Sequence, residues 1–315
     1  MKVILNIGFV LILAFCLQAC GQEVKQSEKE NQSDMTFDTL KRQESFEIIN
    51  PKGTTIQTRI LPPLGFQRTK QHDSSFATYL RQLPLKPHGS EVTLYNGEVK
   101  PNFDVYVAVV DLPIGNKDLH QCADAVMRLR AEYLWKRKLY DKIHFNFTNG
   151  FRVDYTEWMK GKRMVVKGNT TYWTQSAAPS NTYKDFWKYM ELIFNYAGTL
   201  SLSKELKSVE ISEMEIGDVF IQSGLTGHSI IVVDMVEDTV TGEKLFLLAQ
   251  SYMPAQETQV LQNPYDSKIS PWYSMNFGER LSTPEWSFEA IDLKRFRLTR
   301  LLLNYANDSH AVGTK

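Results

Sequence analysis

Three runs of residues typical of β-strands follow one another late in the chain, and they limit its fold more than any other feature. The runs are rich in Val, Ile, Leu and Phe and span residues 215–221, 228–235 and 244–251. Short segments that contain glycine separate them, as is usual between neighbouring antiparallel strands. We therefore predict an antiparallel sheet in which these three strands lie side by side.

The register of the last two strands decides which polar side chain lies beside His228 at the start of the middle run. If Val236 pairs with Lys244, side-chain alternation puts Gln250 on the face that carries His228. A shift of one residue would put Ser251 there instead. Either side chain could orient an imidazole, so both are candidates for that role.

A helix is predicted from Leu119 to Lys138. Asp118 and Gln121 have the spacing of a capping box, in which Asp118 accepts hydrogen bonds from the first backbone amides and Gln121 reaches back. Apolar residues at steps of three and four then form one stripe along the helix: Leu119, Cys122, Val126, Leu129 and Tyr133.

Cys122 has two interpretations. A thiol in the first turns of a helix feels the positive end of the helix dipole, which favours the thiolate, and backbone amides near Gln121 and Cys122 could bind an oxyanion. A cysteine on an apolar stripe is also what a small, silent core residue would look like. The sequence leaves both interpretations open.

The remainder of the predicted domain alternates short strands, turns and helices. Two further helices are predicted at 75–83 and 183–197, the first ending before Pro84. Asn96-Gly97 predicts a tight hairpin turn within residues 91–100. The other predicted strands are 103–111, 144–147, 152–155, 163–167, 286–291 and 296–303.

The N-terminus predicts export. Residues 3–17 form an apolar stretch of the length of a signal-peptide core, too short to span a bilayer comfortably. The sequence Leu17-Gln18-Ala19-Cys20 resembles the bacterial lipobox, which implies removal of residues 1–19 and attachment of lipid to Cys20. The polar composition of residues 20–45 predicts a flexible tether. A single α+β domain is then expected at 46–304, followed by a polar tail at 305–315.

Charge and cysteine usage narrow the function further. Lys plus Arg and Asp plus Glu both total 36, so no net charge would attract nucleic acid. The six histidines lack metal-ligand spacing, and we predict neither a metal nor a cofactor. With Cys16 in the removed signal and Cys20 lipidated, Cys122 is the one free thiol expected in a compartment where thiols are usually oxidised.

These motifs together resemble the NlpC-type papain-fold hydrolases, which cut bacterial cell-wall peptides. The resemblance covers about residues 115–252 and rests on a cysteine that heads a helix, a Gly-Asp-Val-Phe-Ile strand, a Gly-His strand and a third strand with a polar residue. It implies a papain-like core whose antiparallel sheet packs on the cysteine-bearing helix, with N-terminal and inserted elements added. The chain also resembles an uncharacterised family of exported lipoproteins over most of its mature length.

Carried over by position, the resemblance implies that Cys122 is the nucleophile, His228 the general base and Gln250 the group that orients the histidine. The loop after Gln250 is aromatic and is a candidate substrate rim, with Ser251, Tyr252 and Trp272 as its members.

The expected function is thus an envelope-anchored lipoprotein that hydrolyses amide bonds in cell-wall peptides. It would be held by its lipid in the periplasm or on the outer membrane, with a cell-wall peptide as its partner, no nucleic acid and no indicated oligomer. The rival is a catalytically inactive papain-like lipoprotein that binds a peptide or glycan in the envelope.

Overall fold

The computed structural model describes residues 47–224 and 226–297. The predicted signal peptide, the lipidation site at Cys20, the tether and the polar tail lie outside the described residues. Within them, the fold is a mixed α/β domain dominated by antiparallel strands, with few helices.

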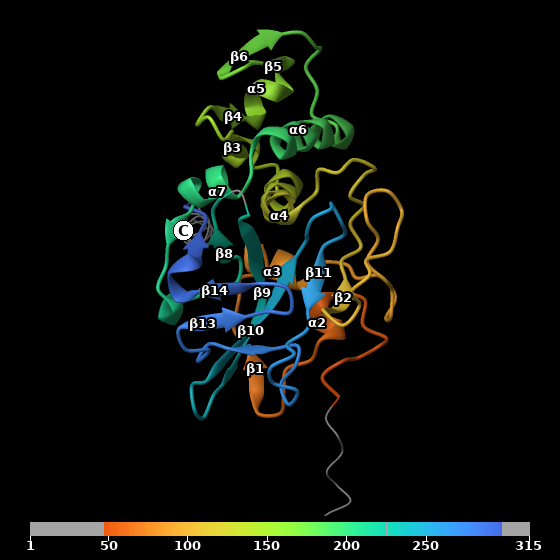
Figure 1. Ribbon diagram of the computed structural model, residues 1–315, viewed down its shortest axis with the longest axis vertical. Coiled ribbons are helices and arrows are strands. Elements are labelled where there is room, and N and C mark those ends of the chain that lie inside the picture. The colour runs from red at the N-terminus through yellow and green to blue at the C-terminus, as the bar shows by residue number, and fades with distance from the viewer. Residues whose placement is uncertain (1–46, 225, 298–315) are drawn as a thin grey trace, which may run out of the picture. The chain divides into compact units, whose positions relative to one another are not determined.

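One antiparallel sheet of nine strands forms the centre of the described domain (Figure 1). Its main path runs β2 (Tyr106–Val109), β11 (Gln259–Leu261), β10 (Lys244–Gln250), β9 (His228–Asp238), β8 (Val219–Gln222), β15 (Leu293–Arg295) and β7 (Lys207–Ser208). Two more strands join this path at the side, β1 (Phe66–Arg68) on β9 and β12 (Tyr273–Ser274) on β10. The predicted antiparallel arrangement of the three β-rich runs is confirmed in β8, β9 and β10.

The register between β9 and β10 differs from the prediction at one end and agrees at the other. Val236 pairs with Leu245, one residue from the predicted partner. An irregularity after Leu247 then shifts the register, so that Ala249 pairs with Ile231. A β-bulge inserts one residue into one strand only, and here it restores the predicted placement of the following residue, Gln250.

The helices are α2 (Ile56–Arg59), α3 (Phe76–Arg81), α4 (Cys122–Lys136), α5 (Tyr155–Met159), α6 (Tyr183–Tyr196) and α7 (Thr199–Glu205), with 3₁₀ turns at Tyr140–Lys142, Ile211–Glu213 and Ala290–Asp292. The predicted helix 183–197 is confirmed in α6, where Thr182 caps the first turn. The predicted helix 75–83 is confirmed as the shorter α3, capped by Ser75.

Helix α4 lies between the large sheet on one side and α6 on the other (Figure 1). All of its residues from 122 to 134 are buried, and not only the predicted apolar stripe. Four of these buried residues are charged: Asp124, Arg128, Arg130 and Glu132. A helix covered on all sides is more deeply placed than an amphipathic surface helix, and this depth governs the chemistry of its first residue.

Three small hairpins accompany the sheet: β3 (His144–Asn146) with β4 (Arg152–Asp154), β5 (Lys162–Lys167) with β6 (Thr170–Gln175), and β13 (Arg280–Ser282) with β14 (Ser287–Glu289). The first two lie beyond α4 from the sheet, together with α5 and α6 (Figure 1). The predicted hairpin at 91–100 keeps its tight turn, with Gly97 at a φ of 87°, but forms a single bridge rather than two strands.

The end of the described chain departs from the prediction. The predicted strand 286–291 is β14 followed by a 3₁₀ turn, and the last strand of the sheet is β15 at Leu293–Arg295. The strand predicted at 296–303 lies almost wholly outside the described residues. Of its residues, Phe296 and Arg297 are described, and neither is in a strand.

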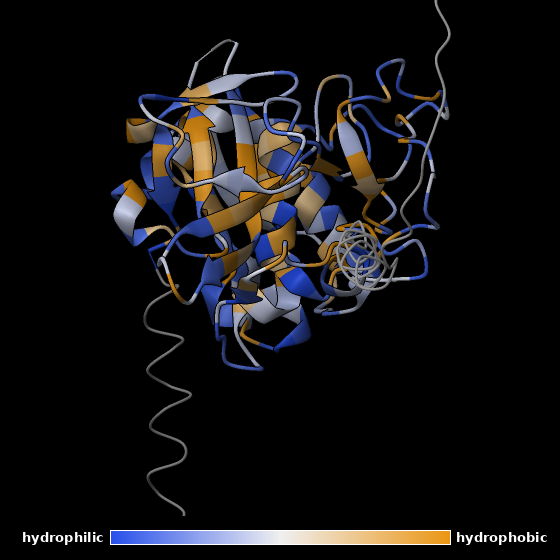
Figure 2. Ribbon diagram, turned by 90° about the horizontal axis from the view of Figure 1, so that it is seen from below, coloured by the Kyte–Doolittle hydropathy of each residue, from blue (hydrophilic) through white to orange (hydrophobic). Residues whose placement is uncertain are grey.

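The hydrophobic core follows the sheet and α4. In Figure 2 the apolar residues gather along the central strands, while polar residues predominate on the loops around them. The buried core includes almost every apolar residue of β8, β9 and β10. Within residues 47–224 and 226–297, no helix combines the length and the apolar character needed to span a membrane.

Candidate functional site

Cys122 is the first residue of α4, which begins three residues later than predicted. Gln121 is the N-cap residue, and its backbone N–H donates to the Asp124 carboxylate at 3.0 Å. Asp118 does not cap the helix, contrary to the prediction. It accepts hydrogen bonds from the Gln121 side chain at 3.1 Å and from the Ala255 backbone N–H at 2.7 Å. The capping box is thus shifted by three residues: Gln121 takes the N-cap position expected for Asp118, and Asp124 takes the reach-back role expected for Gln121.

The predicted oxyanion role of the backbone amides near Gln121 and Cys122 is therefore reduced to one position. The Gln121 N–H is bound to Asp124 and its side chain is bound to Asp118. The N–H groups at the start of a helix have no partner within the helix, and that of Cys122 is the first of them. An oxyanion beside the thiol would be bound there.

The Cys122 thiol packs against the start of β9. Its side chain is 7% exposed, and the backbone N–H and hydroxyl of Ser229 face the sulfur. Burial is the largest influence and raises the pKa of the Cys122 thiol. The Ser229 backbone N–H lowers this pKa, Asp124 raises it by less, and the Ser229 hydroxyl lowers it by the smallest amount. In the free protein, desolvation thus outweighs the expected stabilisation of thiolate by the helix dipole.

His228 stands at the first position of β9, one residue before Ser229. Gly227, the residue before it, lies close to two other segments of the chain. A Cβ there would lie 2.4 Å from the Gln222 carbonyl oxygen and 2.7 Å from Thr199 Oγ1. Only glycine fits there without displacing its neighbours, which explains the Gly-His pair in the sequence.

The His228 imidazole is bound by Gln250, as predicted. Its Nε2 lies 2.8 Å from Gln250 Oε1, while Nδ1 forms no hydrogen bond with any residue that the structure describes. Aromatic rings surround it, with centroid distances of 4.8 Å to Tyr252 and 5.3 Å to Trp286. Burial lowers the pKa of His228 to about 4, which keeps the ring neutral at pH 7. Lys100 adds to this lowering, and Gln250 opposes it.

The thiol and the imidazole are thus both located at the first two residues of β9. Cys122 contacts Ser229, and His228 is the residue before it. Tyr252 links the two groups, since its ring packs on His228 and Cys122 is near enough to raise the pKa of its hydroxyl. No hydrogen bond joins Cys122 to His228 within the described part of the chain.

A buried polar network that no sequence pattern indicates continues beyond Gln250. Gln250 Nε2 donates to Glu285 Oε2 at 2.7 Å, and Lys100 Nζ donates to the same oxygen at 2.8 Å. Lys100 also donates to Gln256 at 3.0 Å and is 3% exposed. Lys100 and Glu285 are 185 residues apart, and neither lies in a strand or helix whose periodicity would place it.

Of the three residues predicted to form a substrate rim, one is partly exposed and two are buried. Tyr252 is partly exposed and contacts His228. Ser251 is fully buried, with its hydroxyl 2.8 Å from the His120 carbonyl oxygen and 2.7 Å from that of Gln256. Trp272 is also fully buried and donates its indole N–H to Leu61 O. Both belong to the core, because the loop after Gln250 turns inward against the residues before α4.

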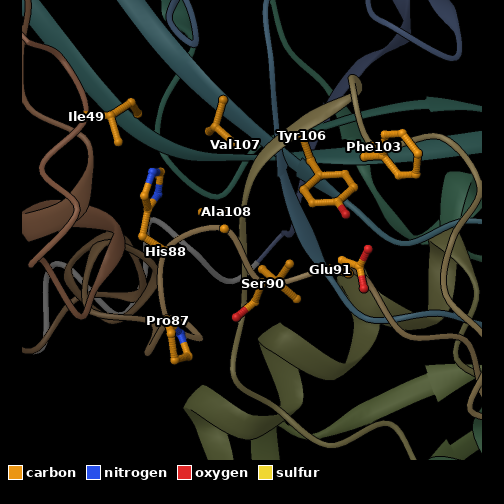
Figure 3. A pocket seen from close by; sticks show the side chains of 11 residues that line it. Ile49, Pro87, His88, Ser90, Glu91, Phe103, Tyr106, Val107 and Ala108 are labelled. Carbon is orange, nitrogen blue, oxygen red and sulfur yellow. The ribbon is translucent and has the colours of Figure 1, made fainter.

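A cavity of about 500 Å³ on the described surface is lined by Glu285 and Trp286, both neighbours of the His228 site, and by Arg280 and Tyr265. Another, of about 370 Å³, lies at the edge strand β2 and is shown in Figure 3, where Phe103, Tyr106 and Glu91 lie on one side and His88 on the other. The described residues include no cluster of three His, Cys, Asp or Glu side chains arranged to hold a metal ion.

The fold and this site define a class of protein: a mixed α/β domain in which a helix-terminal thiol packs against the strand that carries the imidazole of an imidazole–amide pair. Residues 56–295 match the family model described as "Domain of unknown function (4846)", and the chain belongs to that family. Neither the curated proteins nor the solved structures include a match to this chain.

Proposed function

We propose that the protein is a thiol-dependent amide hydrolase with a papain-like, NlpC-type core. The observation that carries this proposal is the position of Cys122 at the N-terminus of α4 and against Ser229, next to a histidine that Gln250 holds through Nε2. A cysteine nucleophile needs a base and a group that orients the base, and these three side chains have the chemistry for those roles.

In the proposed reaction His228 Nδ1 accepts the thiol proton as Cys122 Sγ attacks an amide carbonyl carbon. The oxyanion is stabilised by the Cys122 backbone N–H at the start of α4. The protonated imidazole then gives its proton to the leaving amine, and water hydrolyses the thioester. Both groups start neutral, because burial raises the pKa of Cys122 and lowers that of His228, so proton transfer accompanies the attack.

The proposed substrate is a peptide of the bacterial cell wall, met in the envelope to which lipid on Cys20 would hold the protein. This rests on the lipobox-like sequence Leu17-Gln18-Ala19-Cys20 and on the NlpC-like motifs. Replacement of Cys20 by serine is expected to move the protein from the membrane fraction to the soluble fraction and to abolish incorporation of labelled fatty acid. Fatty-acid labelling that persists in Cys20→Ser would refute the anchor.

Alkylation tests the site. Cys122 is the one cysteine expected to remain free in the mature chain, so iodoacetamide uptake at neutral pH reports on it directly. We expect uptake by the wild type, none by Cys122→Ser, and much slower uptake by His228→Ala. The matched control is His88→Ala, because His88 is exposed and lies outside the site. A native protein whose Cys122 does not react, or reacts equally without His228, would overturn the proposal.

Activity is tested with purified peptidoglycan. The wild type is expected to release new amino termini, and Cys122→Ser is expected to release none. Loss of a general base commonly costs 10²–10⁴-fold, so His228→Ala should fall by about that factor.

A second function is favoured by one observation, the depth of Cys122. A thiol that is 7% exposed, with a pKa raised by burial, is also what an inert core cysteine shows. In that case the protein would be an inactive papain-like lipoprotein that binds a peptide or glycan. It would then bind peptidoglycan fragments equally well in the wild type and in Cys122→Ser, without releasing amino termini from either.

A further inference from the structure

The hydrogen-bond partners of Gln250 determine which way its amide faces. Its two ends meet different groups, with Nε2 2.7 Å from Glu285 Oε2 and Oε1 2.8 Å from His228 Nε2. An ionised carboxylate accepts hydrogen bonds and cannot donate one, so the NH₂ end of the amide must face Glu285. The carbonyl end then faces the imidazole.

The direction of the amide in turn determines the tautomer of His228. An amide oxygen is an acceptor, so the imidazole nitrogen that faces it must carry a hydrogen. In a neutral imidazole the other nitrogen, Nδ1, is then an acceptor with a free lone pair. Nδ1 forms no hydrogen bond with a described residue, which leaves it available.

Lys100 keeps Glu285 in the state that this chain of bonds requires. Its ammonium group donates to the same Glu285 oxygen at 2.8 Å, and the two side chains are 4% and 11% exposed. A buried carboxylate stays ionised when a cation is paired with it. The Lys100 ammonium group is itself fixed by Gln256 Oε1, so the pair has a defined position relative to Gln250.

We propose that Glu285, held by Lys100, is a positioning residue that fixes the Gln250 amide and thereby keeps the His228 proton on Nε2 and the Nδ1 lone pair free. Glu285 touches neither Cys122 nor His228 and acts through Gln250. The value of this arrangement for catalysis rests on the proposed function, since the free lone pair matters only if Cys122 gives up its proton. The tautomer itself does not depend on that function.

The experiment measures the ¹⁵N chemical shifts of His228 in the purified full-length protein at neutral pH. The His228 signals are assigned by their absence in His228→Gln. We expect a protonated-type shift at Nε2 and an unprotonated-type shift at Nδ1. The opposite tautomer in the wild type would overturn the proposal without any variant.

Variants then test the role of Glu285. Lys100→Met with Glu285→Met removes both charges together, so that neither is left buried and unpaired. A hydrogen bond to a charged group commonly changes such an equilibrium by about tenfold or more, so the ratio of the two tautomers should shift towards Nδ1–H by about that factor. Glu285→Met alone is the second variant, and it should shift the ratio in the same direction.

One control separates positioning from general damage. Glu285→Gln keeps an acceptor oxygen in the same place, and Lys100 can still donate to it. This variant should retain the wild-type tautomer. A double variant that folds and keeps the wild-type ratio would overturn the proposal.

Alkylation of Cys122 in the same proteins distinguishes this inference from the proposed function. If the tautomer shifts as expected while Cys122 is inert in the wild type, Glu285 positions the histidine and the hydrolase proposal fails. If Cys122 reacts quickly with the aid of His228 while the tautomer is indifferent to Glu285, the hydrolase proposal stands and this inference fails.

Discussion

Strand β9 carries two buried polar clusters that differ in how fully their atoms are bonded, one at its first residues (the near end) and one around Asp234 in its second half (the far end). At the far end, the Asp234 carboxylate is paired with Arg68 and Arg81 and also accepts the Met235 N–H. Arg81 donates further to Thr69 and to the Met235 carbonyl. At the near end, His228 Nδ1 forms no hydrogen bond with the described residues, and the Ser229 hydroxyl and Asp124 Oδ1 also lack one.

This difference indicates that the Asp234 cluster stabilises the fold, whereas the His228 cluster has polar atoms available to a substrate. Buried polar groups are normally bonded, and each exception calls for an explanation. The Asp234 cluster has no exception and ties β1 and α3 to β9. The His228 cluster has several within a few residues of a thiol, as expected where a substrate is to supply the missing partners.

The largest expected effect is on stability at the far end. Asp234→Asn leaves the buried Arg81 and the partly buried Arg68 without their counter-ion, and breaking such a buried pair commonly costs about 3–5 kcal/mol of unfolding free energy. Urea unfolding measures it. Glu237→Gln, on the same strand, is the control and should change the free energy by less than about 0.5 kcal/mol. An Asp234→Asn protein as stable as the wild type would remove the contrast between the two ends.

His228→Gln should show the opposite profile. The amide retains a donor for Gln250 but cannot act as a base, so peptidoglycan cleavage should fall by about a hundredfold or more while the unfolding midpoint changes little. The release of amino termini and the urea midpoint, measured on one preparation, test both statements. If His228→Gln lost much stability but cleaved peptidoglycan as well as the wild type, the near end of β9 would also serve to stabilise the fold.

The pH dependence of stability should reflect the near end. His228, with a pKa lowered to about 4, and His120, with a pKa lowered to about 3, are neutral in the folded protein near pH 6. The unfolded chain takes up their protons near the ordinary pKa of about 6.5, so unfolding is favoured as the pH falls from 6.5 towards 4.

The slope is about 1.4 kcal/mol per pH unit for each proton taken up on unfolding. His228→Gln should therefore reduce the slope of unfolding free energy against pH by about 1.4 kcal/mol per pH unit between pH 6.5 and 4. Urea unfolding at several pH values gives both curves. Parallel curves for the wild type and the variant would show that His228 is already charged in the folded state.

Much of the centre of the fold could be predicted because it depends on local patterns. The apolar runs of β8, β9 and β10 and the predicted helix 183–197 each indicate their own element, and Gly227 marks the close approach before His228. Gln250 was placed correctly although the assumed pairing of Val236 was wrong by one residue. A bulge whose position no pattern indicated compensated for the error.

The parts that were missed depend on contacts between distant residues. The start of α4 was misplaced because Asp124 and Asp118 are both plausible partners for the first turn, and only the packing of Ala255 against Asp118 decides between them. Glu285 and Lys100 meet through tertiary structure alone. Trp272 has the composition of a rim residue, and its burial depends on Leu61, more than two hundred residues earlier.

Ser229→Ala is the smallest expected effect and the finest test of the comparison. The Ser229 hydroxyl is buried without a hydrogen bond of its own, yet it lowers the pKa of the Cys122 thiol. Its removal should raise that pKa slightly and slow iodoacetamide uptake at neutral pH by about a few-fold at most, because the hydroxyl is the smallest of the influences on this pKa.

Stability should respond to Ser229→Ala in the opposite sense to Asp234→Asn. Removal of an unbonded buried hydroxyl relieves a desolvation cost, so the unfolding free energy should stay level or rise slightly. The pH profile of alkylation and the urea midpoint of the same variant test the two parts. If Ser229→Ala lowered the unfolding free energy while the alkylation rate of Cys122 stayed the same, the Ser229 hydroxyl would stabilise the fold. The two ends of β9 would then differ in their residues, but both would serve stability.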